Sequence, residues 1–134
     1  VKDLDFGMNN ILVRDGKGNK DRVTILPELV KHKLKLQIDY VRSLHQVDTE
    51  NGYGEVYMPD ALARKYPQAS TSLPWQYCFP AQSLSIDPRS NRKRRHHILA
   101  QSVQRGIKRA VLKSQIRKQA SSHTFRHTFA THLL

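Results

Sequence analysis

Residues 8–26 have the sequence MNNILVRDGKGNKDRVTIL, and this stretch decides the class of fold. The segments 8–14 and 22–26 are rich in Ile, Leu and Val with rough alternation, and a Gly-rich turn separates them, so they predict a β-hairpin. Pro27 and Glu28 then open a helix. Its apolar residues recur at spacings of three and four, typical of a buried helical face: Val30, Leu34, Ile38, Val41 and Leu44.

Working outward, the pattern predicts one α+β unit that is mainly helical, with small antiparallel β-hairpins. Residues 46–56 predict a loop, and residues 60–66 predict a short helix that Pro67 ends. Residues 75–79 predict a strand, 87–91 a turn, and the basic run from Arg92 to Leu99 the return strand of a second hairpin.

Two further helices close the chain. The first is predicted from about residue 100 to 113, with Val103, Ile107 and Val111 at four-residue spacing. Ser121 or Ser122 is predicted to cap the second helix. Its apolar residues are expected to pack inward, and they are Phe125, Phe129 and Leu133.

Positive charge is concentrated in the last third of the chain. The 134 residues include 23 Lys and Arg and 11 Asp and Glu, a net charge of +12. Residues 1–87 contain 11 of each kind, whereas residues 88–134 contain the remaining Lys and Arg and no acid. Because solvated surfaces usually mix signs, the acid-free stretch predicts one face that binds a polyanion, with nucleic acid as the leading partner.

The composition excludes several other classes of protein. No apolar run approaches the ~20 residues that a membrane span needs, and no signal peptide opens the chain. A single cysteine, Cys78, excludes a disulfide framework and suits a reducing cytoplasm. The chain starts without Met and stops inside an apolar, helix-like stretch, so we expect it to be a piece of a longer protein.

His123 and Arg126 are the first candidates for chemistry. They lie three residues apart at the start of the last predicted helix, and therefore on one face. A helix N-terminus favours an anion, the Arg fork matches phosphate oxygens, and His can hydrogen-bond a phosphate or move a proton near neutral pH. Lys17 lies between two glycines in the first hairpin turn, from where a flexible ammonium could donate a proton to a leaving oxygen.

Two other groups of side chains, the histidines and the aromatics, suggest further binding sites. Five of the seven histidines suggest metal binding, namely His96, His97, His123, His127 and His132. No acid follows Asp87, so neither a metal nor a cofactor is expected. Trp75, Tyr77 and Phe79 alternate, which predicts that one face packs into the core. Trp75 near basic residues could instead stack on an unpaired base, which is worth roughly 1–3 kcal/mol.

Together these features resemble the catalytic domain of the tyrosine recombinases of the phage integrase family, and specifically the integron integrases. The first motif is GKGNKDR at residues 16–22, and the second is HTFRHTFATHLL at residues 123–134. Between them, residues 61–67, 75–77, 87–90 and 94–97 resemble the segment that distinguishes integron integrases from relatives that resolve chromosome dimers. The resemblance covers essentially the whole chain and implies a mainly helical tyrosine-recombinase core.

The resemblance implies a role for each motif residue. Lys17 would be the general acid that protonates the leaving 5′ oxygen, Arg126 would stabilise charge on the non-bridging oxygens of the scissile phosphate, and His123 would assist proton transfer. Family members of this type recombine a folded single strand and grip bases that bulge from its hairpin. The residues predicted to bind this DNA are Trp75, Pro88, Arg94, Arg95, His96 and His97.

Residues 1–134 would then be a partial catalytic domain. The N-terminal DNA-binding domain and the first catalytic Arg would precede residue 1, and the nucleophilic Tyr would follow residue 134. All five tyrosines precede the His123–Arg126 motif, so none matches the nucleophile. The chain itself would bind DNA without cleaving it.

The expected parent is a bacterial, cytoplasmic, nucleoid-associated recombinase that is tetrameric on DNA. It would integrate and excise gene cassettes through a phosphotyrosine intermediate, without metal, cofactor or membrane. Two alternatives remain open: a non-catalytic basic nucleic-acid-binding module and a metal-dependent nuclease.

Overall fold

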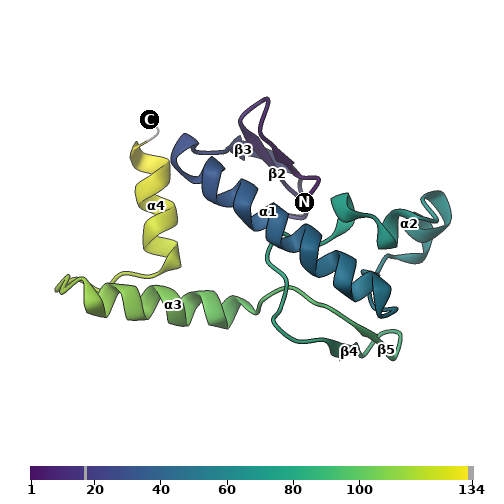
Figure 1. The fold of residues 1–134 in the computed structure, drawn as a ribbon. Coiled ribbons are helices and arrows are strands. Elements are labelled where there is room, and N and C mark those ends of the chain that lie inside the picture. The colour runs from purple at the N-terminus through teal and green to yellow at the C-terminus, as the bar shows by residue number, and fades with distance from the viewer. Residues whose placement is uncertain (17, 133–134) are drawn as a thin grey trace. The chain divides into compact units, whose positions relative to one another are not determined.

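The structure is a computed structural model that describes residues 1–16 and 18–132 (Figure 1). The chain divides into two compact units, Val1–His97 and Ile98–Leu134, which are described separately below. Helices and small antiparallel sheets make up the described residues, which is compatible with the α+β class predicted from the sequence.

The first unit opens with a three-stranded antiparallel sheet in the order β1 (Leu4–Asp5), β2 (Asn10–Val13), β3 (Arg22–Ile25). β2 and β3 pair with Ile11 opposite Thr24, which confirms the predicted hairpin. β1 was not predicted, because two residues are too short to show a period. The chain reverses through Asp15, Gly18 and Asn19, whose φ angles are 48°, 78° and 57°.

α1 (Glu28–Glu50) is the long helix of this unit and begins after Pro27, as predicted. Val41 is buried and Leu34, Ile38 and Leu44 are half-buried, but Val30 is exposed. The predicted loop from residue 46 is wrong in its first part, because the helix continues to Glu50. Beyond Glu50, Gly52 has a φ of 83° and its N–H bonds to the Thr49 carbonyl, which forms a left-handed C-terminal cap.

α2 (Asp60–Lys65) lies between Pro59 and Pro67 and confirms the short predicted helix. The strand predicted at residues 75–79 is wrong: two 3₁₀ turns, η1 (Ala69–Thr71) and η2 (Leu73–Trp75), lead up to Trp75, and residues 76–79 form neither a helix nor a strand. The Trp75 N–H donates to the Ser72 carbonyl at 3.2 Å, which is a local turn bond, so this N–H pairs with no neighbouring strand.

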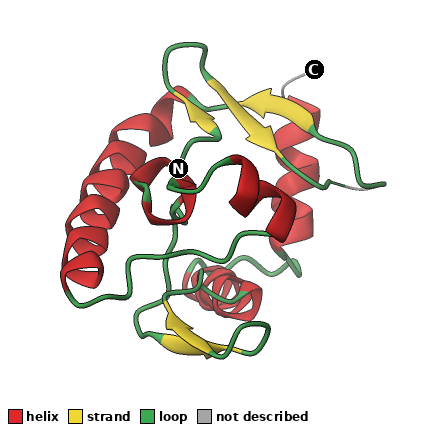
Figure 2. Cartoon of the chain, turned by 90° about the vertical axis from the view of Figure 1, so that its right-hand side faces the viewer, coloured by secondary structure: helices red, strands yellow, loops and turns green. Residues whose placement is uncertain are grey.

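A second, separate hairpin consists of β4 (Ser85–Asp87) and β5 (Arg92–Arg94), visible as the smaller pair of strands in Figure 2. The predicted turn at residues 87–91 is confirmed, with Asn91 N–H donating to the Asp87 carbonyl at 2.7 Å. The return strand therefore exists, but its partner is residues 85–87 rather than 75–79.

The buried core of the first unit mixes apolar and charged side chains. The buried apolar residues are Leu26, Val41, Val56, Met58 and Ala69. Three charged residues are buried with them, namely Asp48, Asp87 and Arg94. Because buried charges are normally paired, these three identify the places where segments are joined by ion pairs.

The second unit contains α3 (Ala100–Lys113) and α4 (Ser122–His132), as predicted. Ser121 caps α4: its N–H donates to Thr124 Oγ1 at 3.1 Å, and the Thr124 N–H donates to Ser121 Oγ at 3.5 Å. The expectation that Phe125 and Phe129 pack inward is wrong, since they are 51% and 42% exposed; Leu133 lies outside the described residues. Two helices alone offer little surface that could bury both rings.

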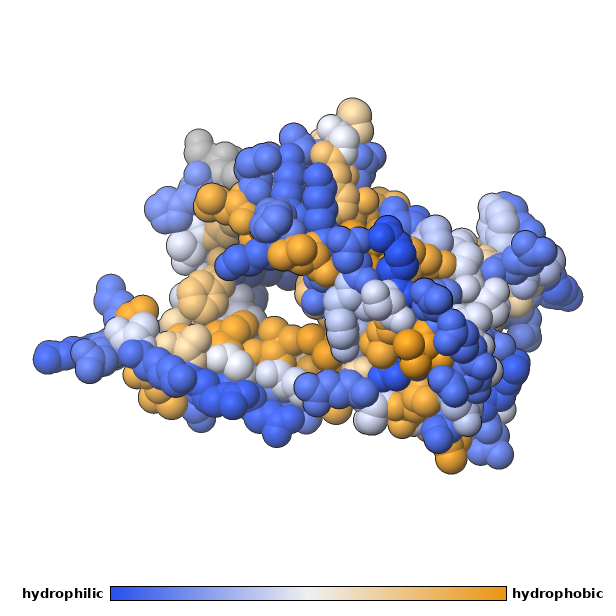
Figure 3. Space-filling view, in the orientation of Figure 1, coloured by the Kyte–Doolittle hydropathy of each residue, from blue (hydrophilic) through white to orange (hydrophobic). Residues whose placement is uncertain are grey.

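α3 has two chemically different sides. Apolar side chains gather along one side and hydrophilic side chains along the other (Figure 3). No helix in the described part of the chain is both long enough and apolar enough to cross a membrane.

Candidate nucleic-acid interface

α4 presents His123 and Arg126 in its first turns. The Ser121 cap fixes where the helix begins, so both residues lie close to the N-terminal end of its dipole. Both side chains are exposed, and the second unit contains no acidic residue that could pair with Arg126. A guanidinium, an imidazole and a helix N-terminus together form a site that favours a phosphate.

His127 is a neighbour of His123 that the sequence analysis left without a role. The two Nε2 atoms lie 3.0 Å apart, and the rings meet edge to face with centroids 4.5 Å apart. One ring donates this hydrogen bond and the other accepts it. The i, i+4 spacing on α4 was the signal available in the sequence.

Lys17, the third predicted catalytic residue, lies outside the described residues. The turn around it is held by two short bonds: Gly16 N–H donates to the Lys20 carbonyl at 3.1 Å, and Asn19 N–H donates to the Gly16 carbonyl at 2.9 Å. His123 and Arg126 belong to the second unit, so the three predicted catalytic residues are not brought together in one described site.

The basic side chains of α3 lie in a unit that has no acidic side chain. Arg105, Lys108, Arg109 and Lys113 follow one another at spacings of three, one and four residues, opposite the apolar Val103, Ile107 and Val111. Residues 98–134 contain seven Lys and Arg and no Asp or Glu, so carboxylates of this unit's side chains cannot neutralise them. This unit matches the prediction of a basic face for a polyanion.

The first unit holds five other basic residues of the acid-free stretch, and four of them, Arg89, Arg92, Arg94 and Arg95, are instead paired with acids. Asp87 is 0% exposed and accepts hydrogen bonds from Arg89 Nε at 3.0 Å and Arg94 Nη1 at 3.3 Å. The bond from Arg89 holds the pKa of the Asp87 carboxyl below its ordinary value. Arg89 also lies over the Tyr57 ring, 3.7 Å from its centroid.

Glu55 extends this ion-pair cluster. Its Oε1 lies 2.5 Å from Arg94 Nη2 and 2.9 Å from Arg92 Nη1. Arg94, which was predicted to bind DNA, is therefore buried between two carboxylates. Its partners favour a structural role in the first unit, and DNA contact by Arg94 stays an untested prediction.

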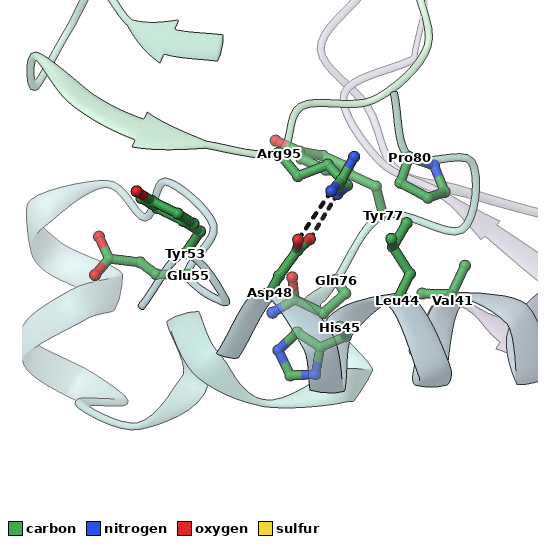
Figure 4. Close-up of a pocket in the computed structure, with 10 residues that line it drawn as sticks. All are labelled: Val41, Leu44, His45, Asp48, Tyr53, Glu55, Gln76, Tyr77, Pro80 and Arg95. Atoms are coloured by element: carbon green, nitrogen blue, oxygen red, sulfur yellow. Dashed lines mark hydrogen bonds and ion pairs between the residues drawn. The ribbon is translucent and has the colours of Figure 1, made fainter. Parts of the chain in front are cut away.

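Arg95, which directly follows β5, is also paired with an acid. Asp48, near the end of α1, accepts from Arg95 Nε at 2.5 Å and from Nη2 at 2.8 Å (Figure 4). This pairing raises the pKa of Arg95. DNA contact by Arg95 is likewise untested, and its geometry also favours a structural role.

His96 and His97 follow this paired segment. His96 is half-buried and His97 is exposed. The His97 ring meets the Tyr77 ring edge to face, with centroids 5.2 Å apart. Pro88 is exposed at the β4–β5 turn.

Trp75 lies in a different environment from the histidines. Its ring is 6.1 Å from that of Tyr66, and Lys2 Nζ lies 4.5 Å from its centroid. The ring also lines a groove of the first unit, with Tyr57, Leu62 and Phe79 among the other lining residues. An aromatic ring beside a cation on a groove wall is suited to stacking on an unpaired base.

The sequence analysis missed the acids that organise this region, which are Asp48, Glu55 and Asp87. A turn sequence beginning Asp-Pro marked Asp87 as a candidate turn acceptor. No local signal marked Asp48 or Glu55, because their partners lie about 40 residues further along the chain. Among residues 1–16 and 18–132, no group of three or more His, Cys, Asp or Glu side chains could hold a metal ion.

The profile of the phage integrase family matches residues 1–134. This chain belongs to the phage integrase family. Two curated proteins named Integrase/recombinase, from Escherichia coli and Pseudomonas aeruginosa, are each 48% identical to it over 134 residues. The match covers the whole chain but only 40% of each relative, so this phage integrase family chain spans about two fifths of their length. The family membership supports the tyrosine-recombinase assignment made from its motifs.

Proposed function

We propose that this chain is part of the catalytic domain of a tyrosine recombinase that carries out site-specific DNA recombination. The observation that carries the proposal is the phage integrase match over all 134 residues together with His123 and Arg126 at the capped start of α4. In this proposal the chain is a partial catalytic domain, and a DNA-binding domain, a first catalytic Arg and a nucleophilic Tyr are supplied by other parts of a longer protein.

The proposed chemistry is transfer of a phosphodiester to a tyrosine. The Tyr oxygen attacks phosphorus, the bond to the 5′ oxygen breaks, and Lys17 donates a proton to that oxygen. Arg126 stabilises charge on the non-bridging oxygens and His123 assists proton transfer. Preorganised charges of this kind lower phosphoryl-transfer barriers, and the bond energy kept in the phosphotyrosine allows the strand to be rejoined without ATP or metal.

The finer proposal is an integron-type integrase that recombines gene cassettes. In this proposal Trp75, Pro88, His96 and His97 contact bases that bulge from a folded single-stranded site. The exposed ring of His97 and the half-exposed ring of Trp75 support it, because unpaired bases are commonly bound by stacking on such rings. The parent is proposed to act as a tetramer on DNA in the bacterial cytoplasm, associated with the nucleoid.

The proposal is tested by comparing catalysis with binding in the full-length recombinase. Lys17→Ala, His123→Ala and Arg126→Ala should reduce recombination by at least about 100-fold while the Kd for DNA changes much less. Arg117→Ala is the matched control, because it removes a basic side chain of the same unit that belongs to neither motif. Equal losses of recombination and binding would instead support the alternative, a non-catalytic basic nucleic-acid-binding module.

The base-contact proposal has its own test. Trp75→Ala or His97→Ala should weaken binding of a folded hairpin site more than binding of a fully paired duplex. Equal effects on the two substrates would assign these residues to packing alone.

The metal-dependent nuclease is tested by measuring DNA cleavage in excess chelator. Undiminished cleavage excludes that alternative, and abolished cleavage supports it.

A further inference from the structure

Asp48 is a buried acid with an unusual position in a basic, DNA-binding chain. It is 6% exposed and lies in the last turns of α1, and its two carboxylate oxygens accept two bonds from the Arg95 guanidinium. Figure 4 shows the two side chains pointing toward each other, joined by two parallel bonds. A two-pronged pair of this kind fixes orientation as well as distance.

Arg95 also bonds to a second segment of the chain, at residues 81–82. Its Nη1 donates to the carbonyl oxygens of Ala81 at 2.9 Å and Gln82 at 2.8 Å. All three nitrogens of the guanidinium therefore have partners: Nε and Nη2 bond to Asp48 on α1, and Nη1 bonds to the two carbonyls at residues 81–82. The Arg95 side chain thus joins these two segments to the part of the chain that directly follows β5.

The segment at residues 80–82, which Arg95 holds, is bonded to the backbone of His96 and His97. The Ala81 N–H donates to the His96 carbonyl at 2.6 Å, and Pro80 forms a bridge with His97. The His97 ring is in turn placed against Tyr77. Both histidine rings thus project from a backbone whose position depends on Arg95 and, behind it, Asp48.

We propose that Asp48 is a positioning residue that sets, through Arg95, the place of the His96 and His97 rings and so the preference for unpaired bases over paired duplex. This inference rests on the base-contact role proposed above for the two histidines. Asp48 itself touches no DNA in this proposal, because its carboxylate is buried and negatively charged. Its effect is on selectivity and not on the general attraction of the chain for phosphates.

The direction in which Asp48→Asn changes DNA affinity distinguishes a positioning role from a purely electrostatic one. Replacing Asp48 by Asn removes a negative charge and frees Arg95, so charge alone predicts tighter binding to any DNA. A displaced pair of histidine rings predicts weaker binding to the folded site only. Asp39→Asn is the matched control, because Asp39 lies on the same helix, pairs with Arg42 at 2.8 Å at the surface, and loses the same charge.

The experiment measures Kd for two DNA probes, a single-stranded hairpin with two unpaired bases and the same stem as a fully paired duplex. With Asp48→Asn, hairpin binding should weaken by at least about fivefold relative to duplex binding, the fold-change expected for losing one base stack. With Asp39→Asn the ratio should not change. An unchanged ratio in Asp48→Asn would overturn the proposal.

A double-variant comparison distinguishes failure of this proposal from failure of the base-contact role. His96→Ala/His97→Ala should lower the hairpin-to-duplex preference, and adding Asp48→Asn to it should lower the preference no further. If the histidine variant leaves the preference intact, the base-contact role is wrong and the Asp48 proposal fails with it. If the histidine variant lowers it but Asp48→Asn has its full effect in that background, only the positioning role is wrong.

Asp48→Glu keeps the assay informative if Asp48→Asn does not fold. It retains the charge and adds one methylene, which must displace the Arg95 fork from its present position. Folding of each variant is checked by its thermal unfolding transition. A folded Asp48→Glu should show the selective loss on the hairpin, and an unchanged hairpin-to-duplex ratio would overturn the proposal.

Discussion

Asp87 shows how one buried residue organises the hairpin that carries the predicted base-contacting Pro88. Its carboxylate accepts bonds from Arg89 and Arg94, and its carbonyl closes the turn through Asn91. Sequence reasoning assigned these arginines to DNA because it counted charges along the chain. The structure pairs both with Asp87 in the same hairpin and pairs Arg94 with Glu55 from an earlier segment as well, which a count of charges along the chain cannot show.

The lowered pKa of Asp87 makes stability depend on pH in a definite direction. Its folded pKa lies below its unfolded value of 3.8, so its contribution is present above about pH 4 and is lost as the pH falls further. Asp87→Asn should lower the melting temperature at pH 7 and flatten its fall below pH 4, as measured by circular dichroism. Asp21→Asn is the control, because Asp21 is exposed and lies 3.7 Å from Arg14. An unchanged pH profile in Asp87→Asn would refute the role assigned to this carboxylate.

Replacing either of two glycines by Ala should change the stability of the chain, in opposite directions. A Cβ on Gly54 would lie 2.1 Å from Thr49 Oγ1 and 2.9 Å from Thr49 Cα, so Gly54→Ala should destabilise the chain by about 1–3 kcal/mol. A Cβ on Gly106, in α3, meets no described atom within 4 Å, so Gly106→Ala should stabilise that helix by about 0.5–1 kcal/mol. Urea unfolding measures both, and equal shifts would contradict the close approach at Gly54.

At the scale of elements, the local patterns predicted most of the fold. The first hairpin, the start of α1, α2, α3 and the capped start of α4 all follow from turns, caps and periodicity near them in sequence. The end of α1 was misplaced because the polar residues before Asn51 read as loop, although Gly52 carried a usable cap signal. The false strand at residues 75–79 came from alternating aromatics, but Trp75 ends a 3₁₀ turn and the residues after it up to Phe79 are irregular.

The candidate site was predictable only where its residues are close in sequence. His123 and Arg126 share one helix, so their proximity follows from spacing alone. The partners of Arg94 and Arg95 lie about 40 and 47 residues away, and such long-range pairs leave no mark on a single sequence. These pairs decide which cations remain free for DNA.

α3 carries the basic side chains that should contribute most to phosphate binding. Arg109→Ala with Lys113→Ala should reduce the slope of log Kd against log salt by about two, roughly one unit for each lost phosphate contact. Lys33→Ala with Lys35→Ala on α1 is the control and should change the slope less. Titrations of a labelled duplex at several salt concentrations provide the measurement. A larger change from the α1 pair would contradict the assignment of the DNA-facing charge to α3.

At the scale of the whole molecule, the cations behind the net charge of +12 are not equally available to bind phosphates. Several arginines of the first unit are paired, whereas the second unit has seven basic residues and no acid. If six to ten cations meet phosphates, affinity should fall by about 10³–10⁵ between roughly 50 and 200 mM salt. Fluorescence anisotropy of the 134-residue chain with duplex DNA measures this. A flat salt response would contradict the basic-face account.

We propose that Arg126 and His123 bind the scissile phosphate and that another part of a longer recombinase supplies the nucleophile. The most direct test is the amount of covalent protein–DNA adduct formed on a labelled recombination site by three proteins: the full-length recombinase, its Arg126→Ala variant and residues 1–134. We predict adduct with the first, at least about 100-fold less with the second, and none with the third. Adduct formed by residues 1–134 alone, or undiminished adduct with Arg126→Ala, would contradict the account.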